Sequence, residues 1–111
     1  MEFASIFNGL GVDTTLCIRG KRILKDFDPE ISDFMMNQMH MRGIKFLTQS
    51  FPSKIQFKNN KYKVFFPNKI NFYEQVMEAT GRVANLNKLK INNTDVKLNK
   101  NNSIVVNNIF Q

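Results

Sequence analysis

The segment VDTTLCIRGKRILKDFD, residues 12–28, joins an apolar run to a cluster of cations. β-Branched and apolar side chains over residues 12–18 predict a strand. Four cations follow it: Arg19, Lys21, Arg22 and Lys25. Basic side chains at the carboxyl end of a strand are typical of α/β sheets that bind anionic ligands at that edge. The segment therefore predicts an α/β fold with an anion site beside Arg19.

The charge pattern after this strand also favours one kind of dinucleotide. In dinucleotide-binding folds the end of the second strand contacts the adenosine ribose. A carboxylate there hydrogen-bonds a free 2′-hydroxyl, whereas a guanidinium suits a 2′-phosphate. No acid lies between Arg19 and Asp26, so the pattern favours NADP over NAD. The alternative interpretation is a solvated basic loop, because charge runs usually lie on surfaces.

Three segments carry a resemblance to one protein family. They are EFASIFNGLGVDTTLCIRGKRILKDFD (residues 2–28), ATGRVAN (residues 79–85) and VKLNKNNSIVVNN (residues 96–108). The first resembles the NADPH-binding domain of glutathione reductases, which are FAD-dependent pyridine nucleotide–disulfide oxidoreductases. The second resembles the family's A-T-G-R-x-P-N loop, and the third resembles the segment that returns to the FAD domain. The resemblance covers essentially the whole chain.

The resemblance implies an NADPH site in the basic loop, the segment that holds Arg19, Lys21, Arg22 and Lys25. Arg19 matches the arginine that pairs with the 2′-phosphate. Lys25 stands where the family has a second arginine, and it keeps the charge but loses the bidentate fork. Lys21 and Arg22 could compensate for that loss. The resemblance thus implies a partial NADPH site, with FAD bound only in the intact family.

The resemblance also implies cofactor contacts outside the basic loop. Glu2 matches a glutamate that reaches toward the flavin and nicotinamide. Gly81 and Arg82 match the loop that closes over the bound dinucleotide. This loop departs from the family pattern at Ala84, where proline is usual, and at Glu78, where an apolar residue is usual. These departures predict relaxed packing around the loop.

The expected fold is α/β: a partial Rossmann-type three-layer domain that lacks its first strand and carries an antiparallel hairpin or meander. Residues 1–83 are expected to form an incomplete NADPH-binding domain, and residues 84–111 to return toward an FAD domain. The patterns predict helices over residues 2–10 and from Asp28 to Gly43, a parallel strand over 44–47, a hairpin over 54–66, and strands over 72–79 and 103–106. Ile31, Phe34, Met35 and Met39 form the expected buried stripe of the second helix.

The family is several times longer than 111 residues, so we expect the chain to be a fragment. The phosphate-binding glycines, both FAD motifs, the redox C-x-x-x-x-C and the acid–base histidine of the family have no match in it. The expected partners are NADPH and the missing FAD and interface domains or a complementary chain. A homodimer is implied for the intact family only. Alone, the fragment is expected to be marginally stable and without turnover, and its last residues to be loose.

Composition places the chain in a broad class. It is 42% hydrophobic, which is typical of a globular domain, and it carries a net charge of +7, which favours an anionic partner. No apolar run approaches the ~20 residues that span a bilayer, and the first residues do not resemble a secretory signal. One cysteine, Cys17, fits a reducing compartment, so we expect a cytoplasmic location, with an organelle as the alternative.

Cys17 and His40 are the two other side chains that could take part in catalysis. Cys17 lies within an apolar strand, where cysteines are mostly inert. His40 is expected on the surface near the end of the second helix. No cluster of His, Cys and acidic residues suggests a metal, and no catalytic residue is predicted.

Two alternatives to the reductase interpretation remain open. KNNKYKVFFPNK, residues 58–69, interleaves cations with aromatics, as single-stranded nucleic-acid binders do. No RNP-like or helix-turn-helix pattern accompanies it. The other alternative is a gene remnant that has no function of its own.

Overall fold

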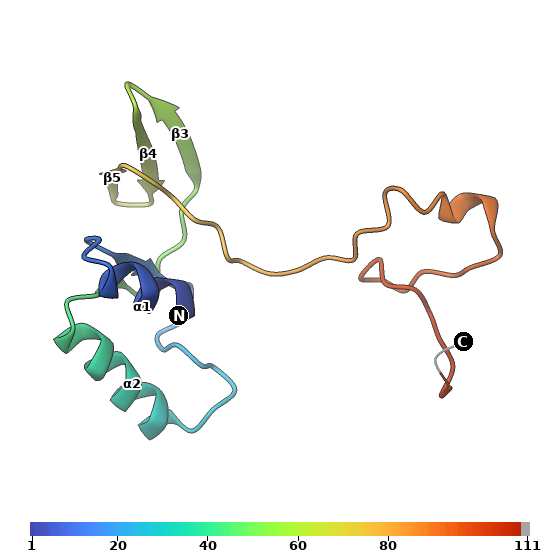
Figure 1. Ribbon diagram of the computed structural model, residues 1–111, viewed down its shortest axis with the longest axis horizontal. Coiled ribbons are helices and arrows are strands. Elements are labelled where there is room, and N and C mark those ends of the chain that lie inside the picture. The colour runs from blue at the N-terminus through green and yellow to red at the C-terminus, as the bar shows by residue number, and fades with distance from the viewer. Residues whose placement is uncertain (110–111) are drawn as a thin grey trace. The chain divides into compact units, whose positions relative to one another are not determined.

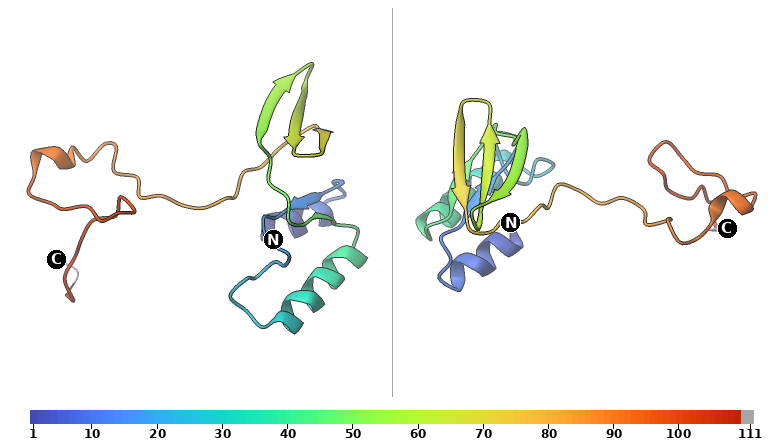
Figure 2. Two further views of the ribbon diagram at one scale, coloured as in Figure 1. Left: turned by 180° about the vertical axis from the view of Figure 1, so that it is seen from behind. Right: turned by 90° about the horizontal axis from the view of Figure 1, so that it is seen from above.

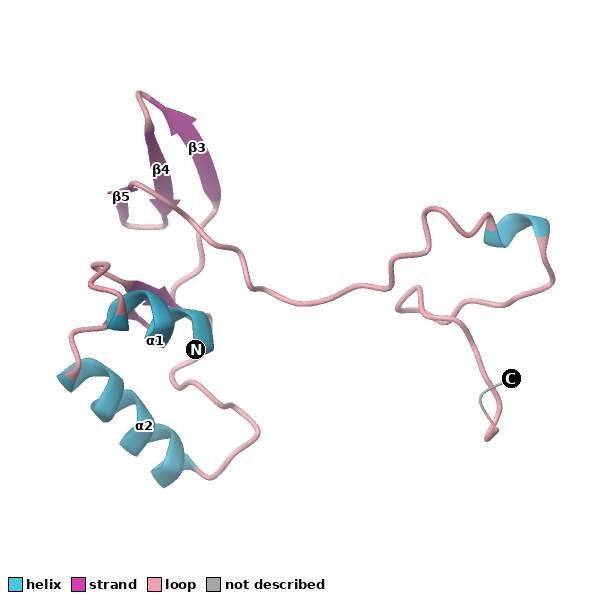
Figure 3. Cartoon of the chain, in the orientation of Figure 1, coloured by secondary structure: helices cyan, strands magenta, loops and turns pink. Residues whose placement is uncertain are grey.

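The structure, a computed structural model, describes residues 1–109 and divides into two compact units, at Val76 and Met77 (Figure 1). The first unit holds two α-helices and five strands. They are α1 (Glu2–Gly9), β1 (Thr15–Cys17), α2 (Pro29–Met41), β2 (Lys45–Leu47), β3 (Lys54–Lys58), β4 (Lys61–Phe66) and β5 (Lys69–Tyr73). The second unit holds one 3-10 turn, η1 (Ile91–Asn93). Figure 3 shows that a long segment without helix or strand connects β5 to η1.

Strands β1 and β2 pair in parallel, with Leu16 opposite Phe46, as the strand–helix–strand order predicts. β1 is shorter than the expected strand over residues 12–18. The reason lies at its start, where the Val12 amide donates to the Phe7 carbonyl at 3.0 Å and so belongs to the turn that ends α1. Gly11 makes this turn with φ +84°, a left-handed value suited to glycine.

The second helix begins where the sequence predicts. The Asp28 carboxylate accepts a 2.8 Å hydrogen bond from the Glu30 amide, and Pro29 occupies the first helical turn. Met39 is buried as expected, but the predicted stripe is wrong at Ile31 and Phe34, which are 52% and 62% exposed.

Ser32 takes the inward position at the start of α2. It is 1% exposed, and its hydroxyl donates to the Leu24 carbonyl at 3.3 Å. The loop before α2 therefore covers this side of the helix, and a polar side chain with a hydrogen-bond partner replaces an apolar one. The core cluster between the helices and the parallel strands consists of Ala4, Ile23, Met39 and Ile44, surrounded by Leu16, Ile18, Leu24, Met35, Met36 and Phe46, and Val64 and Phe66 are buried on β4.

The expected hairpin is confirmed as β3 and β4, and β5 extends it into a three-stranded antiparallel sheet (Figure 2). Asn59 and Asn60 form its turn with φ values of +52° and +61°, which Asn tolerates better than most residues. The predicted strand over residues 72–79 is wrong. Its first two residues belong to β5, and no described strand lies beside residues 75–79 to pair with their backbone groups.

The second unit is mostly irregular, as its Asn- and Lys-rich sequence indicates. The expected strand over residues 103–106 is reduced to one bridge, between Leu98 and Ile104. The Asn99 side chain closes this turn by accepting from the amides of Asn101 and Ser103. The predicted loose end lies partly outside the described residues. The predicted family boundary after residue 83 stays a prediction.

Candidate functional site

The basic loop after β1 lies beside the loop after β2. The Ile18 amide donates to the Leu47 carbonyl at 2.9 Å, and the Ser50 amide donates to the Ile18 carbonyl at 3.1 Å. The Gln49 amide donates to the Gly20 carbonyl at 2.9 Å. These bonds continue the parallel ladder past both strands, so the carboxyl ends of β1 and β2 form one edge.

Arg19 is exposed at this edge. Its guanidinium carbon lies 4.5 Å from the centroid of the Phe51 ring. Among the described residues Arg19 has no hydrogen-bond or ion-pair partner for its side chain. Because a neutral ring and not an acid lies against the guanidinium, its N–H groups remain available at the edge to an oxyanion.

Arg22 is engaged differently. Its Nε lies 2.5 Å from Asp33 Oδ1 and its Nη2 lies 2.8 Å from Asp33 Oδ2, which makes a bidentate pair. This hydrogen bonding lowers the pKa of the Asp33 carboxyl below its ordinary value, and the charges of Arg22 and Lys21 lower it further. Arg22 therefore binds a carboxylate of the chain itself. Its expected contact with a cofactor stays a prediction.

Lys21 and Lys25 are exposed on the loop between β1 and α2. Two residues anchor this loop. Ile23 is 4% exposed in the core, and Leu24 has φ +50°, which turns the chain there. The anchors leave both lysines at the surface, where they add positive charge to the loop that carries Arg19.

The other predicted cofactor residues lie in α1 and in the second unit, and among the described residues no hydrogen bond or ion pair joins Glu2 to this loop. Glu2 is exposed in the first turn of α1. Gly81 and Arg82 belong to the second unit and are exposed. Gly81 has φ +152°, a conformation that side-chain-bearing residues rarely adopt, although a Cβ there would meet no atom within 4 Å. A side chain at position 81 would therefore strain the backbone conformation, but it would not clash with neighbouring atoms.

Cys17 lies on β1 with its thiol turned to the neighbouring loop. Sγ is 3.4 Å from the Ser50 carbonyl oxygen. Burial raises the pKa of the Cys17 thiol, and the charge of Lys69 opposes this in part. The thiol is therefore protonated at neutral pH and poorly suited to act as a nucleophile. His40 is exposed in the last turn of α2.

Lysines and aromatic rings share one face of the antiparallel sheet. Lys63 Nζ lies 5.0 Å from the Phe65 ring centroid and 5.9 Å from that of Phe72. The ammonium group thus lies against rings on which a base would stack, although Phe72 remains 61% exposed. Lys61 pairs with Glu74 at 3.0 Å. A shallow hollow of about 400 Å³ remains there, lined by Lys58, Asn59, Lys61, Lys63 and Phe72.

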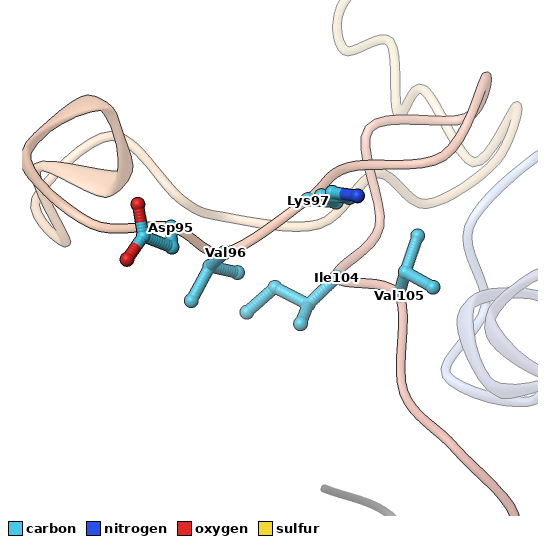
Figure 4. Close-up of a pocket in the computed structure, with 5 residues that line it drawn as sticks. All are labelled: Asp95, Val96, Lys97, Ile104 and Val105. Atoms are coloured by element: carbon cyan, nitrogen blue, oxygen red, sulfur yellow. The ribbon is translucent and has the colours of Figure 1, made fainter.

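A hollow of about 480 Å³ lies in the second unit (Figure 4). Its lining is mainly aliphatic and consists of Asp95, Val96, Lys97, Ile104 and Val105. Over residues 1–109 no three His, Cys, Asp or Glu side chains gather as metal ligands would. In the same range none of the helices has the length and apolarity needed to cross a membrane.

Comparison with known proteins assigns the family. The family model described as "Pyridine nucleotide-disulphide oxidoreductase" matches residues 1–111. The chain belongs to this family. Its members are flavin-dependent disulfide reductases that use a pyridine nucleotide, so the family-level resemblance drawn from the sequence is confirmed.

Individual relatives show how much of a complete reductase the chain represents. It is 29% identical to the mercuric reductase of Lysinibacillus sphaericus over all of the chain and 21% of that protein. It is 35% identical to the trypanothione reductase of Leishmania donovani over 96% of the chain and 22% of that protein. The chain thus spans about a fifth of these relatives.

Solved structures show the same fold. The HOCl-induced flavoprotein disulfide reductase RclA from Escherichia coli superposes with a TM-score of 0.88, at 22% identity over 96% of this chain and 24% of that chain. An engineered water-forming NADPH oxidase bound to NADPH superposes with a TM-score of 0.82, at 17% identity over 96% of this chain. Parallel and antiparallel sheets, with α2 between the two parallel strands, make the chain a partial Rossmann-like α/β domain, as expected.

Two residues of the candidate site were missed in the sequence. Phe51 follows β2 as Arg19 follows β1, and the carboxyl ends of parallel strands meet at one edge. That rule could have paired the two loops. The pairing of Asp33 with Arg22 could not be predicted from the sequence, because it depends on the path of the loop between the two residues.

Proposed function

We propose that the chain is the NADPH-binding portion of a disulfide reductase of the glutathione reductase type. The observation that carries the proposal is Arg19, an exposed guanidinium that lies at the carboxyl edge of the parallel strands and has no acidic partner among the described residues. A guanidinium there suits the 2′-phosphate that distinguishes NADPH from NADH. Lys21 and Lys25 add positive charge on the same loop. Family membership supports a nicotinamide nucleotide as the ligand.

The complete enzyme would contain much that lies outside this chain. The resemblance implies an FAD domain, an interface domain that makes a homodimer, and a strand beside β1 that completes a three-layer Rossmann domain. In such an enzyme bound NADPH supplies a hydride, and its two electrons pass through FAD to a disulfide and finally to glutathione disulfide. This chain would bind and orient the nucleotide, and the resemblance implies a contact with a dinucleotide for Gly81 and Arg82 as well. We expect no turnover from it alone, and a cytoplasmic location.

The experiment that tests the proposal compares NADPH with NADH. The 111-residue chain is titrated with each nucleotide by calorimetry, and Arg19→Ala is titrated in parallel. We expect NADPH to bind more tightly than NADH. A charged hydrogen-bonding partner contributes roughly 1.5–3 kcal/mol, so R19A should weaken NADPH binding about 10- to 150-fold and leave NADH binding nearly unchanged.

Arg42→Ala is the matched control, because it removes the same charge from an exposed arginine of the same unit. Equal affinity for both nucleotides, or the same loss from R42A as from R19A, would contradict a 2′-phosphate site at Arg19.

A further inference from the structure

Phe51 has an unusual place for a phenylalanine. Its side chain is 50% exposed, it is not part of the core, and its ring lies under the Arg19 guanidinium at 4.5 Å. Burial therefore does not account for its position. The contact that it makes is with the one cation of the loop assigned to phosphate.

Backbone hydrogen bonds hold the two side chains together. The loop after β2 is tied to the loop after β1 on both sides of Arg19, through Ile18 and Gly20. Gln49 has φ +48°, a left-handed turn that redirects the chain just before Phe51. The stack thus follows from the pairing of two loops and does not depend on either side chain alone.

The cations of the basic loop differ in how they are held. Arg22 is oriented, but Asp33 occupies its donors. Lys21 and Lys25 have no ring or acidic side chain in contact within residues 1–109. Arg19 alone is oriented by a neutral group, which leaves its charge and its edge available. An arginine held in this way loses less freedom when it binds a phosphate.

We propose that Phe51 is a positioning residue for recognition of the 2′-phosphate: its ring holds the Arg19 guanidinium at the carboxyl edge of the parallel strands, with its N–H groups left for the phosphate. This rests on the proposed function, since it assumes that Arg19 binds the 2′-phosphate of NADPH. Phe51 then strengthens the preference for NADPH over NADH that Arg19 provides, without contacting the phosphate itself.

The test uses two small probes that differ by one phosphate, 2′,5′-ADP and 5′-AMP. Affinities are measured by NMR titration for the intact chain and for Phe51→Leu, which keeps apolar bulk but removes the ring. A cation–π contact at an exposed site corresponds to about a two- to fivefold change in affinity. We expect F51L to weaken binding of 2′,5′-ADP by that factor and to leave 5′-AMP binding unchanged. Phe51→Trp keeps a ring face and should restore the affinity.

A second readout reports the stack without any ligand. The Arg19 side-chain protons should be shifted upfield by the ring current in the intact chain, and F51L should abolish that shift. In an Arg19→Ala background, F51L should cause no further loss of 2′,5′-ADP affinity, because Phe51 acts through Arg19.

The outcomes separate the two proposals. If R19A weakens 2′,5′-ADP binding and F51L does not, the role of Phe51 is overturned and the NADPH site stands. If F51L weakens both probes equally, Phe51 contacts another part of the nucleotide or supports the fold, and the positioning role is overturned. If the intact chain binds 2′,5′-ADP no better than 5′-AMP, both proposals fail together.

Discussion

Arginines 19 and 22 lie three positions apart in one loop and have opposite situations. The Arg19 guanidinium rests on a neutral ring, whereas the Arg22 guanidinium is bound by the Asp33 carboxylate. Charge alone does not separate them in the sequence. Arg19 can therefore bind an external phosphate directly, whereas Arg22 would first have to break its ion pair with Asp33.

Asp33→Asn should release Arg22 for the nucleotide. Removal of the carboxylate leaves an unpaired guanidinium in the basic loop and one more unit of positive charge. We expect NADPH affinity to rise a few-fold at low salt and the gain to shrink at high salt, since exposed charges are screened. Titration at two ionic strengths measures this, with Asp26→Asn as the control for charge alone. An equal rise in both variants would mean that release of Arg22 plays no part.

The Asp33→Asn variant should also change how the stability of the fold depends on pH. The pKa of Asp33 is lowered in the folded chain, chiefly by its hydrogen bond to Arg22, so the pair stabilises the fold above the ordinary carboxyl pKa. This contribution is lost as pH falls through the lowered pKa. The stability difference between the intact chain and D33N should therefore be larger at pH 6 than at pH 2.5. Urea unfolding at the two pH values measures it, and a difference that does not change with pH would contradict the account.

At the scale of the elements, the start of α2 determines where the basic loop ends. The Asp28 carboxylate caps the helix at the Glu30 amide, and Ser32 ties the first turn to Leu24. The helix and the loop are thus fastened together just after Lys25. A weakened helix start should loosen the loop that carries the proposed nucleotide site.

Asp28→Ala tests this connection. Loss of an N-cap side chain costs about 1 kcal/mol of stability, because the Glu30 amide loses its partner. Asp26→Ala removes an exposed acid two residues earlier and should cost much less, since it caps no helix. Chemical denaturation of the two variants measures the difference. Equal losses would show that the cap contributes nothing beyond its charge.

At the scale of the whole molecule, much apolar surface is left uncovered. The side chains of Phe3 and Ile6 on α1 are both 52% exposed, that of Leu10 at the end of the helix is 76% exposed, and within α1 Ala4 alone is buried. The chain covers about a fifth of its curated relatives, whose remaining length could supply what covers this helix. The parallel sheet of the first unit has only two strands, so each strand keeps an unpaired edge.

The isolated chain should therefore be marginally stable and prone to associate. We expect a broad thermal transition by circular dichroism and a sedimentation coefficient that rises with concentration. Replacing Phe3 and Leu10 with Lys should reduce association, because both side chains are exposed and charge opposes contact between apolar faces. A soluble monomer that melts cooperatively would contradict the prediction.

The local elements could be predicted from the sequence because their causes are local. Asp28-Pro29 starts a helix, Asn59-Asn60 makes a hairpin turn, and the apolar run before Arg19 makes a strand. The candidate anion site could be anticipated at Arg19 from the strand that precedes it, and more specifically from the family resemblance. These features depend on backbone preferences and side-chain patterns within a few residues.

Only the tertiary structure decided the features that depend on distant neighbours. The strand predicted over residues 72–79 has no described partner beyond Tyr73, and Ile31 and Phe34 have helical spacing but remain exposed. The partners of Arg19 and Arg22 depend on how two loops and a helix meet in space. The sequence by itself determined where the helices, turns and cations lie along the chain. Contact between distant segments decided which of those cations is left available to a phosphate, because ring stacking and ion pairing act only within a few ångströms.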